Sequence, residues 1–165
     1  MSLNPIALLV AALVSLPIGF VWYNPKVFGN AWMKAIGKTQ EDLNKNSPNM
    51  ILIFGLSLLF AFMIAMMLNV VVIHQNGLAS VFQSPDLKGK SVQILIDGNV
   101  SDISNYFRTF GHGAFHGVLV SIFLALPIIA QSAVYERKSF KYIAISVGYW
   151  VVTLAIMGGI ICMWK

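Results

Sequence analysis

The segment Met50–Ile73 reads MILIFGLSLLFAFMIAMMLNVVVI and contains no Asp, Glu, Lys or Arg. A helix that crosses the hydrocarbon core of a bilayer needs about 20 such residues, because the core is roughly 30 Å thick and a helix rises about 1.5 Å per residue. Backbone N–H and C=O groups find no water within lipid, so a helix, which satisfies them internally, is the expected conformation. The segment therefore predicts a transmembrane helix.

Three further segments share these properties and lie at about 5–23, 113–135 and 142–164. Lys26 follows the first of them instead of preceding it, so we expect a retained helix there and not a signal peptide. The sequence predicts an all-α membrane protein, with four transmembrane helices in a bundle, short interfacial helices and a long outer loop.

The composition is typical of a protein that is surrounded by lipid. Of the 165 residues, 58% are hydrophobic and 10% are charged, whereas a soluble domain has roughly 25% charged residues. The length predicts one transmembrane domain over 1–165. The net charge is +5, but no basic run is interleaved with aromatic residues, so we expect no nucleic-acid partner. Cys162 is the only cysteine, which excludes an intrachain disulfide.

Basic residues are distributed unevenly between the two predicted sides. The loop at 24–49 contains four Lys and the turn around Glu136 contains three basic residues, whereas the other side has four in total. Loops rich in Lys and Arg stay in the cytoplasm. We therefore expect both termini and the long loop at about 75–112 to lie on the outer side.

Small residues recur at a spacing of four along the predicted spans. In lipid, such rows mark the places where helix backbones approach one another. We expect them to form the packing faces of the bundle: Ala11, Ser15 and Gly19; Ala61, Ala65 and Asn69; Gly113, Gly117 and Ser121; Gly148 and Gly159. Pro17 and Pro127 lie inside spans, where each removes a backbone donor and is expected to kink its helix.

The connecting segments also carry patterns. Phe28, Trp32 and Ile36 recur at a spacing of four, which predicts a short interfacial helix on the inner side. In the outer loop, alternation over 92–96 indicates a short strand. An apolar stripe over 103–110 indicates a further interfacial helix, which Ser101 or Asp102 could cap.

The chain has three histidines, and all are expected on the outer side. His112 and His116 are four residues apart and share a helix face, and His74 ends the second span. Three imidazoles could bind zinc, copper or another transition metal; they could form a pH-sensitive cluster; or they could be interfacial residues hydrogen-bonded to backbone or water. We also assign Trp22, Tyr23 and Asn24 to a candidate polar pocket with them, although aromatic residues at span ends are commonly interface anchors.

The sequence shows no catalytic constellation. No charged residue lies within a span, and no pair of nucleophile and base is visible. We therefore expect a protein that is not an enzyme and has no cofactor, apart from a possible transition metal at the histidines.

Four ordered elements resemble one family of bacterial proteins. They are Trp22-Tyr23-Asn24-Pro25 with Phe28-Gly29 and Trp32; His112-Gly113-Ala114-Phe115-His116-Gly117; Tyr135-Glu136-Arg137-Lys138; and Gly148-Tyr149-Trp150. The set resembles the family known as domain of unknown function 1761 and covers nearly the whole chain. The resemblance implies a small protein of the bacterial inner membrane, with no established activity.

Two functions stay open at this point. One is a non-enzymatic accessory or scaffold subunit of a membrane assembly, or a homo-oligomer, whose partners besides lipid are other membrane proteins or itself. The alternative is a binder or transporter of a small apolar molecule or a metal, through an outer pocket near the histidines.

Overall fold

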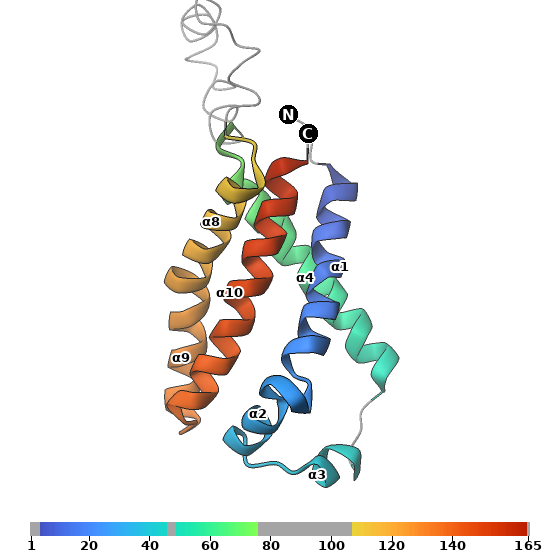
Figure 1. Ribbon diagram of the computed structural model, residues 1–165, viewed down its shortest axis with the longest axis vertical. Coiled ribbons are helices and arrows are strands. Elements are labelled where there is room, and N and C mark those ends of the chain that lie inside the picture. Colours follow the sequence, from blue (N-terminus) through green and yellow to red (C-terminus); the bar gives the residue numbers. More distant parts are fainter. Residues whose placement is uncertain (1–3, 46–48, 76–106, 165) are drawn as a thin grey trace, which may run out of the picture.

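The computed structural model describes residues 4–45, 49–75 and 107–164. In this part of the chain all regular structure is helical: α1 (Pro5–Trp22), η1 (Pro25–Gly29), α2 (Asn30–Ala35), α3 (Gln40–Lys45), α4 (Met50–Val72), α8 (Phe110–Val120), η2 (Ser121–Ala125), α9 (Leu126–Tyr135) and α10 (Phe140–Met163). Helices α1, α4 and α10 and the continuous segment α8–η2–α9 are each long and apolar enough to cross a membrane. The predicted fold class is confirmed (Figure 1).

Side-chain caps determine where the spans begin. The side chains of Asn4, Asn49, Thr109 and Ser139 each accept hydrogen bonds from the first free backbone N–H groups of their helices. Because Thr109 is the cap of α8, the third span begins at Phe110, three residues before the predicted start. Ser101, Asp102, the predicted strand at 92–96 and residues 103–106 of the predicted interfacial helix lie outside the described residues. Residues 107–109 of that predicted helix are not helical, because Thr109 is extended and caps α8.

Helix α10 is the centre of the bundle. Of its most apolar stretch, 56% is buried inside the protein, against 17% for α4. The core joins α1, α4 and α10, and its buried residues include Leu8, Ala65, Leu68, Met157 and Ile161. Figure 1 shows α8 and α9 running along one flank of α10 and α1 along another, while α4 crosses behind them at a steep angle. Each of the other spans therefore depends on α10 for packing.

The closest backbone approach joins α8 to α10. A Cβ added at Gly113 would overlap the carbonyl oxygen of Gly158, and one added at Gly117 would overlap that of Leu154. The Ser121 hydroxyl lies 2.8 Å from the Gly117 carbonyl oxygen and 3.1 Å from that of Trp150, and it donates between them. Only glycine permits this contact, because any side chain would separate the two backbones.

The other predicted packing residues lie mostly at helix contacts. Ala11, Ser15, Ala61, Ala65 and Asn69 are buried, as is Gly159, which faces the Phe110 ring. Gly19 lies against Tyr149, and Gly148 against Trp22.

The two prolines inside spans have different consequences. Helix α1 remains one helix through Pro17. Ahead of Pro127 the third span widens into the π-helical turn η2, after which Pro127 falls in the first turn of α9. A first-turn position needs no backbone N–H, so the widened turn accommodates the proline within a span that continues to Tyr135.

Candidate functional site: a histidine cluster at one end of the bundle

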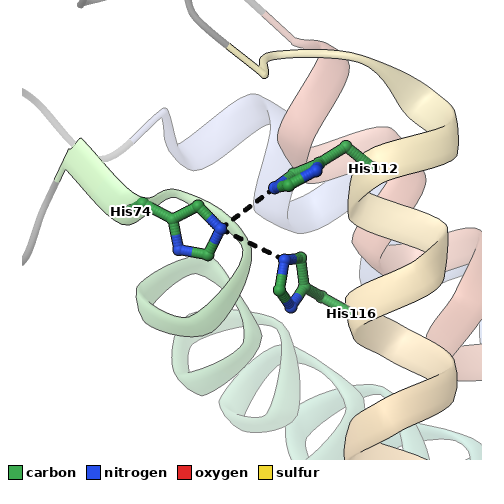
Figure 2. A group of neighbouring side chains, drawn as sticks. All are labelled: His74, His112 and His116. Carbon is green, nitrogen blue, oxygen red and sulfur yellow. Dashed lines mark hydrogen bonds between the residues drawn. The ribbon is translucent and has the colours of Figure 1, made fainter.

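The three histidines meet at one end of the bundle, which we call the histidine end. His74 follows α4, whose last residue is Val72, and His112 and His116 lie one turn apart on α8. Figure 2 shows their rings pointing toward one another across the space between α4 and α8. Residues separated by about forty positions in the sequence thus form one group.

The ring nitrogens converge at short distances. The Nε2 atom of His74 lies 3.0 Å from Nε2 of His112 and 3.1 Å from Nε2 of His116. The three potential ligand atoms all lie within 4.8 Å of one another. The rings are nearly perpendicular, with 83° between His74 and His112 and 80° between His74 and His116.

Hydrogen bonding among the rings alone leaves this group incompletely satisfied. A neutral imidazole has one N–H donor and one acceptor nitrogen. The Nε2 atom of His74 offers either a single hydrogen or a single lone pair, yet it has a close neighbour on each of two sides. A cation among the three nitrogens would instead accept all three lone pairs at once.

The spacing fits a transition-metal ion. Zinc binds imidazole nitrogen at about 2.0–2.1 Å in tetrahedral geometry, which separates neighbouring nitrogens by about 3.3 Å. The observed contacts of 3.0 and 3.1 Å need only small ring movements to reach that separation. His74 is exposed and the other two are half-buried, so an ion can reach them.

Local packing positions the two α8 ligands. The Thr109 hydroxyl accepts the His112 backbone N–H at 3.2 Å, which fixes the start of the helix that carries both rings. The Phe107 ring stacks on the His112 ring with centroids 5.1 Å apart and 18° between planes. Arg108, between these two residues, donates from Nε to the Cys162 carbonyl oxygen at 2.6 Å and also reaches the Trp164 carbonyl, joining this segment to the end of α10.

Sequence reasoning missed Phe107 and Thr109 as supports of the site. A threonine three residues before His112 is a common helix-start signal, so the capping rule applied there would have identified Thr109. The Phe107 contact has no such signal, because it depends on a left-handed backbone at that residue, with φ of 60°.

Trp22, Tyr23 and Asn24 do not join the histidines. They lie at the opposite end of the bundle, which we call the aromatic end (Figure 1). Trp22 packs against Gly148 on α10, whereas Gly113, next to His112, packs against Gly158. Those two α10 positions are ten residues, or about 15 Å, apart. The predicted single pocket of six residues is therefore not formed, because α1 runs away from the histidine end.

The three aromatic-end residues instead hold a turn together. The Trp22 indole N–H donates to the Ile145 carbonyl oxygen at 3.0 Å, and its ring lies 4.5 Å from that of Phe28. The Asn24 side chain accepts the Lys26 backbone N–H at 2.9 Å and begins η1. Tyr23 contacts both Trp32, at 5.4 Å between ring centroids, and Tyr149, at 5.5 Å. The predicted short helix after α1 is present as α2.

The four apolar spans, together with the two clustered ends, define a small helical membrane protein. The chain belongs to the family described as "Protein of unknown function (DUF1761)", whose family model matches residues 6–162. The resemblance drawn from the sequence is thereby confirmed over nearly the whole chain. No curated protein and no solved structure is significantly similar to the chain.

Proposed function

We propose that this membrane protein binds one transition-metal ion through His74, His112 and His116. The convergence of three Nε2 atoms, two pairs of them 3.0 and 3.1 Å apart, carries the proposal. Neutral imidazole favours zinc, copper, nickel and iron among the biological metals. We take zinc as the first candidate, because tetrahedral zinc matches the nitrogen spacing and needs no square-planar ligand set.

Three ligands leave one position of a tetrahedral ion open. Structural zinc sites are closed by four protein ligands, whereas open sites exchange water or a second ligand. The site also lies at a helix end with one exposed ligand, His74. These features support binding and exchange of the ion or of a ligand on it, and we propose binding, not catalysis, as the function.

The metal content of the purified protein tests this proposal. We expect elemental analysis and native mass spectrometry in mild detergent to find one zinc, or one other transition-metal ion, per chain. The ion should survive dialysis against buffer and be lost to a strong chelator. A chain that stays free of metal after loading with zinc and dialysis would contradict the proposal.

A subunit or homo-oligomer role is a second candidate. The row of small residues on α8 is occupied within the chain by α10, so it no longer supports a partner. The observation that favours a partner is the largely uncovered α4, whose most apolar stretch is only 17% buried. The same mass spectra decide this point, since a reproducible complex would support the role and an isolated chain in mild detergent would count against it.

We also propose that the histidine end lies on the outer side of a bacterial inner membrane. The aromatic end carries Lys26, Lys34, Lys38, Lys45, Arg137, Lys138 and Lys141, whereas Arg108 is the one basic residue described at the histidine end. Basic residues favour the cytoplasmic side. Reporter enzymes fused after residue 165 should be active in the periplasm, and activity confined to the cytoplasm would reverse this orientation.

A further inference from the structure

An apolar groove begins directly beneath the histidine cluster. It lies between α4 and the α8–α9 span, has a volume of about 530 Å³, and has Trp150 of α10 as part of its floor. Met67 and Val71 form part of one wall, and Val120 and Leu124 form part of the other. Every residue that lines it is apolar, so the groove itself offers a ligand contact area without hydrogen bonds.

The groove and the histidines follow one another along α8 and at the end of α4. Val71 lies three residues before His74, and Val120 lies one turn after His116. At about 1.5 Å per residue, Val120 lies about 6 Å along α8 from His116, and the end of α4 separates Val71 from His74. A ligand seated in the groove could place one end on the metal without bending away from the protein.

Charge indicates which chemical group the ligand carries at the end that reaches the metal. Three neutral imidazoles leave the full double charge of a zinc ion uncompensated, which is costly near lipid. Within the described residues the acidic side chains are Glu41, Asp42 and Glu136, and all three lie at the aromatic end. Because the three imidazoles are neutral, the open metal position is suited to an anion with an oxygen donor.

Resting on the metal site proposed above, we infer that the protein binds a long-chain fatty acid. Its carboxylate occupies the open metal position and its single acyl chain lies along the groove. The groove opens onto lipid tails that are as apolar as its walls. The acyl chain therefore gains little free energy by moving from the bilayer into the groove. Selection therefore comes from the carboxylate on the metal, and binding of a phospholipid, whose phosphodiester is also an anionic oxygen donor, is the competing outcome that the test distinguishes.

The test uses the full-length protein in nanodiscs of phosphatidylcholine, with palmitate as the probe and its methyl ester as the comparison. We expect one palmitate per zinc-loaded chain in native mass spectra. Affinity should fall at least about tenfold for the ester, which has lost the charge, and at least about tenfold when zinc is removed, a difference of about 1.4 kcal/mol in each case.

A matched pair of variants separates the groove from the metal site. Met67 lines the groove and is 68% exposed, whereas its neighbour Met66 is 43% exposed and does not line it. Met67→Trp should keep zinc and lose palmitate at least about tenfold, while Met66→Trp should keep both. Both positions face outward, so neither substitution is expected to unfold the bundle.

Each outcome separates this inference from the proposed function. Suppose that zinc binds. If palmitate binding does not depend on zinc, if the ester binds equally well, or if the two Trp variants bind palmitate alike, then the fatty-acid inference is wrong and the metal site stands. Phosphatidylcholine retained in place of palmitate would have the same meaning. If zinc itself does not bind, the proposed function fails first.

Discussion

Gly117→Leu should destabilise the bundle by about 3 kcal/mol, at the upper end of what overpacking costs. At this position a Cβ would overlap the backbone carbonyl of Leu154 and crowd the Cα of Ala155, and neither can rotate away as a side chain could. The two helices would have to separate along their whole contact, including the hydrogen bond from Ser121 to the Trp150 carbonyl. Unfolding in detergent, followed by circular dichroism, measures the effect.

Gly55→Leu is the matched control. Gly55 lies inside α4, and an added Cβ there meets nothing within 4 Å. Leucine is a better helix former than glycine by roughly 1 kcal/mol, so this variant should be as stable as the natural protein or slightly more so. Equal loss of stability in both variants would show that the close contact of α8 with α10 is not what holds the bundle together.

His116→Ala should weaken zinc binding by more than about 100-fold. Removing an outer-shell partner of a metal ligand typically costs 10–100-fold, and loss of a ligand itself should exceed that range. The variant should also lose the stabilisation that zinc gives the natural protein, which is about 2.7 kcal/mol when free zinc is 100 times its dissociation constant. Calorimetric titration and thermal unfolding with and without zinc measure the two effects.

Phe115→Ala serves as the control for this variant. Phe115 neighbours His116 on α8, is 59% exposed, and offers no ligand atom. Its loss should leave zinc affinity within a few-fold of that of the natural protein. Zinc affinity that is unchanged in His116→Ala would show that the metal binds without His116, which contradicts a site shared by the three histidines.

The spans could be predicted from the sequence because lipid imposes a simple rule on length and polarity. Segments of about 20 residues without charge were sufficient to place all four helices within a few residues of their ends. The glycines of α8 could also be recognised, because close backbone contact in lipid requires small residues. The widened turn at η2 could not be predicted, because it depends on how α8 and α9 both pack against α10 around Pro127.

The candidate site was predicted in part. His112 and His116 share a helix face by spacing alone, and the span ends placed His74 on the same side. The addition of Trp22, Tyr23 and Asn24 was not supported. These residues lie at the end of α1, on the side of the bundle opposite the histidines. The ring contacts with Phe28 and Trp32 are local, whereas the contact of Tyr23 with Tyr149 joins positions far apart in the sequence, which periodicity does not reveal.

The contacts at the aromatic end give the segment from Trp22 to Gly29 a structural role. Trp22 and Asn24 each satisfy backbone groups, at Ile145 and Lys26 respectively, while Gly29 fits against the backbone of Tyr23 and Asn24. These contacts fix the direction in which the chain leaves α1. The segment therefore maintains the fold at one end of the bundle, and the histidines lie at the other.

X-ray absorption at the zinc edge of the zinc-loaded natural protein tests the central claim most directly. We predict a four-coordinate ion with three imidazole nitrogens at about 2.0–2.1 Å and one oxygen ligand in the fourth position. A spectrum of six oxygen ligands without the multiple scattering of imidazole, or one with a single imidazole, would contradict the proposal that His74, His112 and His116 bind one metal ion together.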